Sequence, residues 1–251
     1  AFSPQRVLHI TFNMGFGGTE QVIRQLILHL PEKDFRNEVL CIDGEVGEIG
    51  KELQLQHGVL IRTLERQPGL DWRLVWNIRR LVRSGGFTIV HCHQYTPWFY
   101  GWLSSLLTGA KLVFTEHGRF YPDRHRRKAW LINKVMARTT DAIVAISKAT
   151  RDALNEFEYL PYKRIRAIYN GIQEPLISAD RRTRMRSDLA FGPDDFVLGT
   201  VARLDGVKNQ KMIIHAFSKF LKSNPASWLL FVGDGPEREN LKSLAKKLNV
   251  T

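Results

Sequence analysis

Two short segments in the last third of the chain place cations where a phosphate group can bind. Arg203 and Lys208 follow an apolar run at 196–201 and precede a stretch with the pattern of a helix. A second apolar run, at 228–232, ends in the glycine-rich turn that contains Gly233. Cations at a helix N-terminus are unfavourable unless an anion binds there, and the free N–H groups of that terminus attract phosphate. The spacing therefore predicts a site for a diphosphate, such as that of a sugar nucleotide.

A glycine-rich segment near the N-terminus suits the same chemistry. Gly17 and Gly18 join an apolar run at 6–12 to a helical pattern, and glycine lets the backbone approach a ligand closely. The dinucleotide fingerprint G-x-G-x-x-G is met only in part, because Glu20 occupies the third glycine position and its charge opposes a pyrophosphate. Asp43, at the end of the next apolar run, keeps an NAD-dependent enzyme among the alternatives, and a structural turn is another.

Histidines end two further apolar runs. His93 follows the run at 89–92, and His117 follows the run at 111–115. Because the carboxyl ends of parallel strands form the ligand crevice of an open α/β sheet, we expect both histidines to converge with the Gly17 loop. Packed side chains without a ligand are the alternative, above all for His91 or His93, which share one side of their strand. We expect no metal site, because the sequence places no third ligand beside them.

The elements that position these residues alternate in type along the chain. Short apolar runs alternate with amphipathic helical patterns, which is typical of a parallel sheet covered by helices. The pattern stops in a polar, arginine-rich stretch and then restarts. We therefore predict an α/β fold of two Rossmann-like domains, the second one incomplete, with an unpaired sheet edge open to association. The predicted boundaries are 1–172 for the first domain, 173–195 for a crossover and 196–251 for the partial second domain.

The charge balance points to anionic partners. The 251 residues include 37 Lys and Arg against 25 Asp and Glu, a net charge of +12. No nucleic-acid-binding motif is present, so nucleic acid is not an expected partner. Between 119 and 138, seven cations interleave with apolar residues such as Trp130 and face one acid, Asp123. This segment is predicted either to dock on an anionic membrane surface or to form an ordinary solvated helix face. The only two cysteines, Cys41 and Cys92, lie in apolar runs and suit a reducing cytoplasm.

The chain resembles the family 4 glycosyltransferases in six motifs, which follow the order of that family along nearly the whole sequence. The motifs are Gly17-Gly18-Thr19-Glu20, His117-Gly118, Ala145-Ile146-Ser147-Lys148, Ile168-Tyr169-Asn170-Gly171-Ile172, Arg203 with Lys208, and Gly233-Asp234-Gly235-Pro236.

This resemblance implies the GT-B fold, in which two Rossmann-like domains face each other, and transfer of a sugar with retention of configuration and without a metal or cofactor. The implied donor is a UDP-, GDP- or ADP-sugar, and the implied acceptor is a glycan or a lipid-linked molecule. His117, Arg203 and Lys208 would form the catalytic set, in which the two cations neutralise the leaving diphosphate and His117 contacts the sugar. The donor side would also include Gly17, Gly18, Asn170, Gly171 and Gly233, and the acceptor side Glu20, His93, Tyr95 and Tyr121. The aromatic residues of the acceptor side are expected in loops at 94–102 and 118–125.

The family's second domain continues beyond the position of Thr251 with the strands that hold the base and with glutamates that grip the donor. We therefore expect residues 1–251 alone to be inactive or weakly active. Two other functions stay open: a non-catalytic module that binds an anionic glycan or lipid head group, and a sugar-nucleotide epimerase. The expected location is the cytoplasm, with peripheral attachment to the membrane through the basic segment.

Overall fold

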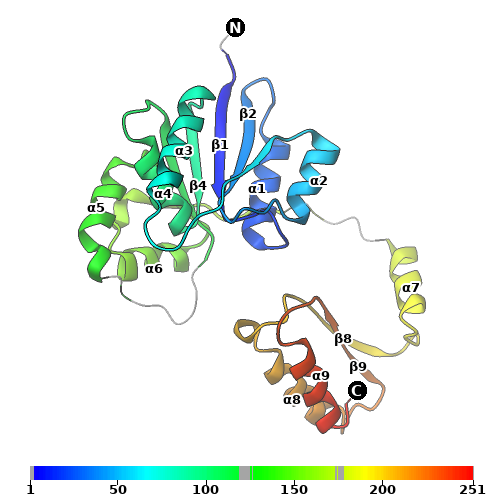
Figure 1. The fold of residues 1–251 in the computed structure, drawn as a ribbon. Coiled ribbons are helices and arrows are strands. Elements are labelled where there is room, and N and C mark those ends of the chain that lie inside the picture. Colours follow the sequence, from blue (N-terminus) through cyan, green and yellow to red (C-terminus); the bar gives the residue numbers. More distant parts are fainter. Residues whose placement is uncertain (1–2, 119–124, 126, 173, 175–177, 251) are drawn as a thin grey trace. The chain divides into compact units, whose positions relative to one another are not determined.

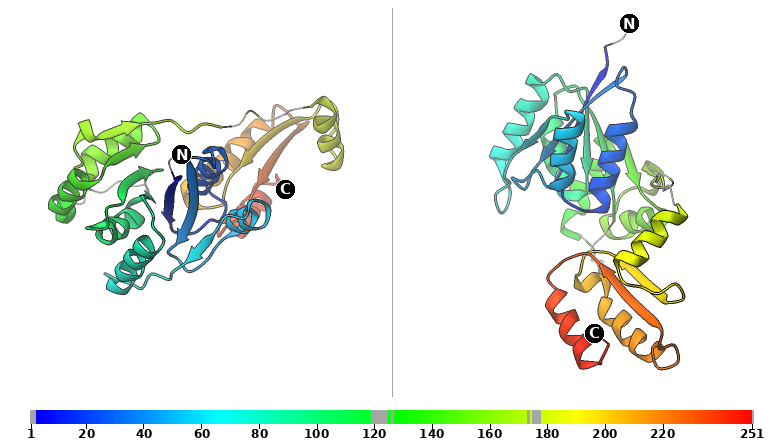
Figure 2. Two further views of the ribbon diagram at one scale, coloured as in Figure 1. Left: turned by 90° about the horizontal axis from the view of Figure 1, so that it is seen from above. Right: turned by 90° about the vertical axis from the view of Figure 1, so that its right-hand side faces the viewer.

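The computed structural model describes residues 3–118, 125, 127–172, 174 and 178–250. The chain divides into two compact units, Ala1–Ile172 and Gln173–Thr251. Figure 1 labels many of their elements, and Figure 2 shows the same ribbon from two further directions.

Unit 1 is built on a parallel sheet of seven strands in the order β3-β2-β1-β4-β5-β6-β7. The strand order reverses between β1 and β4, and at such a reversal the carboxyl ends of the strands open into a crevice. The seven strands are β1 (Gln5–Thr11), β2 (Phe35–Cys41), β3 (Ile61–Thr63), β4 (Ile89–His93), β5 (Lys111–Glu116), β6 (Ala142–Ala145) and β7 (Ile165–Ala167).

Helices cover both faces of this sheet and form two separate apolar cores. One core includes residues of α1 (Gly18–His29) and α2 (Glu48–His57) packed on β2. The larger core takes residues from α3 (Trp72–Ser84), α4 (Tyr95–Ser105), α5 (Trp130–Thr139) and α6 (Lys148–Glu158). Short 3₁₀ turns, η1 (Arg127–Ala129) and η2 (Tyr162–Arg164), precede α5 and β7.

Two helices of unit 1 begin after side chains that cap them. Asp71 Oδ1 accepts a hydrogen bond from the Leu74 N–H at 3.0 Å, and Ser147 Oγ accepts one from the Thr150 N–H at 3.0 Å. Each side chain satisfies a backbone donor that the first turn of a helix leaves free. These caps fix the residues at which α3 and α6 begin.

The expectation of a loop at 94–102 is wrong, because this segment forms the greater part of α4. Tyr95, Trp98, Phe99 and Trp102 recur at the spacing of one helix face, and they pack on the larger core. Trp98 is fully buried, stacks on Phe114 with ring centroids 4.1 Å apart, and donates a hydrogen bond to Thr140 Oγ1. Trp98 therefore holds α4 on the sheet and is not available to an acceptor.

Unit 2 contains a second βαβα pattern, as predicted. Its two strands are parallel and, in the described part of the chain, pair with each other. Its small core centres on Leu204, Ile214 and Leu241. The elements are α7 (Ala179–Asp188), β8 (Phe196–Val201), η3 (Gly206–Lys208), α8 (Gln210–Phe220), β9 (Ser227–Val232) and α9 (Arg238–Lys247). α7 was not expected in the polar crossover; it has no buried residue, and Ser178 caps it.

α4 lies so close to β4 that Gly101 has no room for a side chain. A Cβ atom on Gly101 would lie 2.2 Å from Cys92 Sγ, whereas its next neighbours, Ile10 and Val90, would be at 3.5 and 3.7 Å. The thiol of Cys92 is therefore the single obstacle to a larger residue at this position.

Gly101→Ala is expected to lower the free energy of unfolding by about 1–3 kcal/mol, because the methyl group overpacks the contact with Cys92. Cys92→Ala removes the sulfur, so the double variant should recover much of that loss. Urea unfolding followed by tryptophan fluorescence measures all three variants. If the changes in unfolding free energy of the two single variants simply add in the double variant, the close approach of α4 and β4 is not the cause of the destabilisation.

Candidate functional site

The two loops that follow β8 and β9 in unit 2 interlock through backbone hydrogen bonds. The N–H of Ala202 donates to the carbonyl of Val232 at 3.0 Å, and the N–H of Leu204 donates to the carbonyl of Asp234 at 2.9 Å. Gly233, with a φ of +148°, makes this contact sterically feasible, since a Cβ atom there would lie 2.1 Å from the Ala202 carbonyl oxygen. The loop that carries Arg203 is therefore held firmly.

Arg203 and Lys208 extend from this loop into solvent. The Arg203 side chain is 71% exposed, and among the described residues its one ion pair is a long one, 3.9 Å, with Asp205. Lys208 is exposed and makes no ion pair within the described residues. α8 begins just after them, and its first turn has neither an acidic residue nor a side-chain cap. Two cations beside an uncapped helix N-terminus form a ready site for an anion.

In unit 1, the Gly17 loop was a candidate phosphate site, but an acidic side chain, that of Glu20, lies there. Gly17 is the N-cap of α1 and Gly18 is its first residue. The carboxylate of Glu20 folds back over Gly17, since a Cβ atom on Gly17 would lie 2.2 Å from Glu20 Oε2. Burial is the main cause that raises the pKa of Glu20. Its position leaves the N-terminus of α1 less suited to a pyrophosphate than the cationic loop of unit 2.

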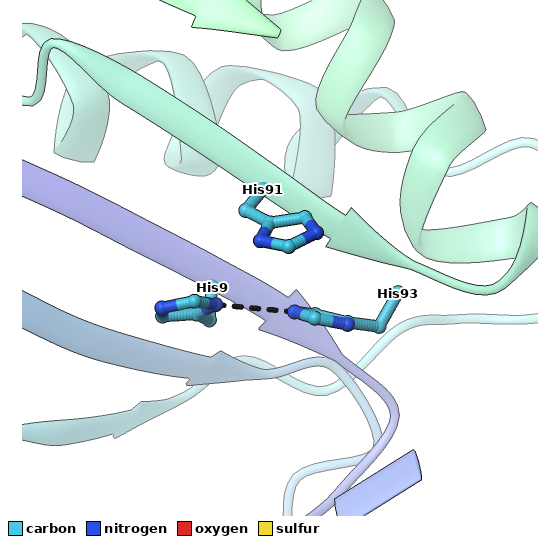
Figure 3. A group of neighbouring side chains, drawn as sticks. All are labelled: His9, His91 and His93. Carbon is cyan, nitrogen blue, oxygen red and sulfur yellow. Dashed lines mark hydrogen bonds between the residues drawn. The ribbon is translucent and has the colours of Figure 1, made fainter. Parts of the chain in front are cut away.

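The structure brings His93 and His117 together, which is one part of the expected convergence with the Gly17 loop, and adds two more histidines. His93 Nδ1 and His117 Nε2 share a hydrogen bond of 2.8 Å. His9, on β1, lies directly opposite His91 in the register of β1 with β4. His9 Nδ1 and His93 Nε2 share a hydrogen bond of 3.1 Å, which Figure 3 shows as a dashed line. His9 was not predicted as part of the site, and the expectation that no third residue able to bind a metal lies beside the strand-end histidines is wrong.

Neighbouring polar groups complete this histidine cluster, defined as His9, His91, His93 and His117. His9 Nε2 lies 3.2 Å from Asn37 Oδ1 on β2, and His91 Nε2 lies 2.8 Å from Thr115 Oγ1 on β5. His117 Nδ1 is a buried atom without a hydrogen-bond partner among the residues described, and so is the hydroxyl of Thr11.

The ring nitrogens of His9, His91 and His93 are close enough to raise the question of a metal. One nitrogen from each lies within 4.8 Å of the others. Metal ligands direct their lone pairs to one common point. Here the nitrogens of His9 and His93 are directed at each other, while the His91 ring lies alongside His93 with centroids 4.2 Å apart and planes 33° apart. This geometry is that of a hydrogen-bonded pair, His9 and His93, with the tilted ring of His91 packed against it.

Burial keeps the histidine cluster neutral at pH 7. Loss of solvation lowers the pKa of His9 and of His117 to about 4. The same cause, with the neighbouring imidazoles adding to it, lowers the pKa of His91 and His93 well below the ordinary range. A neutral imidazole has one donor and one acceptor nitrogen, so the cluster can form a directed chain of hydrogen bonds.

Three other predicted site residues, Asn170, Gly171 and Tyr95, belong to the described part of unit 1. Asn170 and Gly171 follow β7 and are exposed near the end of unit 1. The hydroxyl of Tyr95 donates to Asn133 Oδ1 on α5 at 2.5 Å, so it forms part of the internal structure of unit 1. Tyr121 lies outside the described residues.

Acidification is expected to destabilise unit 1 through the histidine cluster. The unfolded chain takes up a proton on His9 near pH 6.5, whereas the folded chain does so only near pH 4. The lowered folded pKa means that this stabilisation is present above pH 6.5 and declines as the pH falls toward 4. His9 alone should therefore account for a loss of about 2 kcal/mol in unfolding free energy between pH 7 and pH 5.

Urea unfolding at the two pH values measures this loss, and His9→Gln should show a smaller one. The exposed His57 provides the matched control, His57→Gln, which should keep the full pH dependence. A full pH dependence in His9→Gln would contradict the assignment.

Comparison with known proteins agrees with this architecture. The family model described as Glycosyltransferase Family 4 matches residues 16–174, and the model described as Glycosyl transferases group 1 matches residues 181–251. The putative glycosyltransferase EpsD of Bacillus subtilis (strain 168) is 28% identical over 195 residues, which are 69% of this chain and 48% of that protein. N-acetyl-alpha-D-glucosaminyl L-malate synthase of Bacillus anthracis is 23% identical over 188 residues, which are 73% of this chain and 49% of that protein. The chain thus spans about half the length of these two relatives.

Solved structures share the fold at low sequence identity. Anabaena Alr3699/HepE, determined with UDP and glucose, superposes with a TM-score of 0.80 at 20% identity. The alignment covers 98% of this chain and 67% of the Anabaena chain. The UDP-GlcNAc 2-epimerase of Methanocaldococcus jannaschii has a TM-score of 0.58 at 14% identity and covers 98% of this chain and 69% of its own. The predicted α/β fold with Rossmann-like units is confirmed, and the fold alone is common to transferases and epimerases. With the family 4 model extending over most of unit 1, the chain belongs to glycosyltransferase family 4.

Proposed function

We propose that the chain provides the acceptor-side domain and the diphosphate-binding loop of a retaining glycosyltransferase. The reaction transfers a sugar from a nucleoside diphosphate sugar to a glycan or lipid-linked acceptor. The observation that carries this proposal is the pair of exposed cations, Arg203 and Lys208, on an interlocked loop beside the uncapped start of α8. Membership of family 4 favours this reaction over an epimerase, a nicotinamide enzyme or a binding module.

The preferred donor in this proposal is a UDP-sugar. The solved relative of similar fold, Anabaena Alr3699/HepE, was determined with UDP-glucose as well as with UDP and glucose. A diphosphate needs cations and N–H donors; Arg203 and Lys208 offer the cations, and the uncapped first turn of α8 offers the N–H groups. No cofactor enters the proposed reaction.

The chemistry follows from where charge develops. When the diphosphate leaves the anomeric carbon, negative charge grows on its oxygens and positive character grows on the sugar ring. Arg203 and Lys208 stabilise the leaving diphosphate, and a well-placed donor of this kind is worth about 3 kcal/mol in a transition state. His117 contacts the sugar, with Gly17 and Gly18 beside it. In this assignment Asn170, Gly171 and Gly233 shape the donor side, while Glu20 stays on the acceptor side.

UDP and UDP-glucose are expected to raise the melting temperature of unit 2, and Arg203→Ala or Lys208→Ala should abolish most of this shift. Each substitution removes a charge-assisted bond worth about 1.5–3 kcal/mol, which weakens binding by roughly one to two powers of ten. Isothermal titration calorimetry with UDP, GDP, ADP and NAD measures the affinities.

Lys219, exposed in the last turn of α8, provides the control variant Lys219→Ala, which should bind like the unmodified chain. Unchanged UDP binding in both Arg203→Ala and Lys208→Ala would exclude the proposed loop. Binding of NAD alone would favour the nicotinamide alternative.

A second proposal concerns the membrane, where a lipid-linked acceptor would lie: α5 docks on an anionic membrane surface. The exposed side chains of Trp130, Leu131 and Val135 are 44%, 66% and 45% accessible. Lys134 lies over the Trp130 ring, with its ammonium 4.0 Å from the centroid, and Arg138 follows one turn later. Apolar and cationic side chains that share one exposed helix surface suit the interface of an anionic bilayer.

The proposed docking is peripheral. No helix in the described ranges is long and apolar enough to span a bilayer. Cys41 and Cys92 are free and buried, which suits a reducing compartment, so we place this surface at the cytoplasmic face. Part of the basic segment predicted at 119–138 lies outside the described residues.

Vesicles that contain phosphatidylglycerol are expected to bind the chain, whereas vesicles of phosphatidylcholine alone should not. The variant Leu131→Ser/Lys134→Ser should bind the anionic vesicles at least fivefold more weakly, since each cation near the surface contributes about 1 kcal/mol. Co-sedimentation measures the bound fraction. Lys247→Ser, which removes an exposed cation from unit 2, is the control and should bind normally. Equal binding of both variants would rule out α5 as the docking surface.

A further inference from the structure

A line of hydrogen bonds crosses four neighbouring strands and ends at His117. It runs from Asn37 on β2 through His9 on β1 and His93 on β4 to His117, which follows β5. The successive N···O and N···N distances are 3.2, 3.1 and 2.8 Å. The two inner members, His9 and His93, are 1% and 0% exposed, so water does not compete for their nitrogens.

The first link determines the direction of the line. Asn37 presents its carbonyl oxygen Oδ1 to His9, so the proton of this bond is on His9 Nε2. The other nitrogen of a neutral imidazole is an acceptor, and His9 Nδ1 therefore accepts from His93 Nε2–H. In the same way, His93 Nδ1 accepts from His117 Nε2–H. Every link then has one donor and one acceptor.

This direction leaves the Nδ1 lone pair of His117 as the free end of the line. His117 Nδ1 is buried and has no hydrogen-bond partner among the described residues. The hydroxyl of Thr11, which is the next polar side chain after His9 on the same side of β1, also lacks a partner among those residues. An acceptor nitrogen in such a position is complemented by an O–H group, whereas a carbonyl or phosphate oxygen would be repelled.

We propose that Asn37, His9 and His93 are positioning residues that hold His117 in its Nε2–H tautomer, so that Nδ1 accepts a hydrogen bond from a ligand hydroxyl. The assignment of that hydroxyl to the transferred sugar rests on the proposed function, but the tautomer does not. His93 then acts through His117 and not on an acceptor. The reversed line would begin at an Asn37 amide that donates and would end in His117 Nδ1–H.

Nitrogen NMR on the histidine-labelled chain tests the direction of the line. Two-bond ¹H–¹⁵N couplings at pH 7 distinguish the two neutral tautomers and the charged ring. The expected result is the Nε2–H tautomer for His9, His93 and His117. An Nδ1–H tautomer or a charged ring at His117 would overturn the proposal. This measurement uses the unmodified chain and does not depend on the folding of a variant.

Variants of Asn37 test whether Asn37 determines the tautomer of His117 at the other end of the line. Asn37→Leu removes the acceptor and should give His117 a mixture of tautomers, whereas Asn37→Asp, which can only accept, should keep Nε2–H. Unchanged tautomers in a folded Asn37→Leu would refute control by Asn37. Equimolar zinc serves as a further probe: loss of the ring proton signals of His9 and His93 on binding would assign them to a metal site and overturn the proposal.

The affinities of Asn37→Leu for UDP-glucose and for UDP show whether Asn37 positions His117 or has a purely structural role. Asn37→Leu should bind UDP-glucose about five- to tenfold more weakly, because one hydrogen bond to the sugar is lost, and should bind UDP as before. Equal losses for both ligands would indicate a structural role and contradict the proposal. If the tautomer is as expected but no nucleotide sugar binds, the proposed function fails and the tautomer assignment stands. If UDP-glucose binds but His117 has the other tautomer, only this inference fails.

Discussion

The pairing of β1 with β4 is the constraint on which the histidine cluster depends. These two strands are parallel neighbours at the point where the strand order of the sheet reverses. Their register sets His9 opposite His91, and the alternation of side chains then turns His93 to the same face. A shift of one residue would turn these rings into the core on the other face. The backbone ladder thus fixes which imidazole nitrogens can meet.

The two units solve different physical problems. Unit 1 buries neutral histidines, which removes charge from its crevice and leaves directed donors and acceptors. Unit 2 keeps its cations in solvent and uses glycines to interlock the loop that carries them, so that a diphosphate would meet a charge already in position.

Much of the fold could be predicted from the sequence, because apolar runs and capping residues are local signals. The strands of both units and the caps at Asp71 and Ser147 are examples. α4 was missed because its aromatic residues were interpreted as a loop, although their spacing is helical. His9 was missed for a different reason: a single histidine in an apolar strand resembles packing, and its partners come from another strand. The strand order typical of this fold would have placed His9 beside His91, but the hydrogen bonds to Asn37 and His93 depend on side-chain orientations that the sequence does not specify.

The tight contact of Gly101 with Cys92 also affects how the molecule can be observed. The only two thiols of the chain, Cys41 and Cys92, lie in unit 1, are free, and are buried. Burial raises the pKa of Cys41 to about 12 and that of Cys92 still further. Neither thiol therefore reacts as a thiolate while the helices stay packed on the sheet. Alkylation of Cys92 requires α4 to separate from β4. The rate of thiol labelling therefore reports how often unit 1 opens, and it is insensitive to the opening of unit 2.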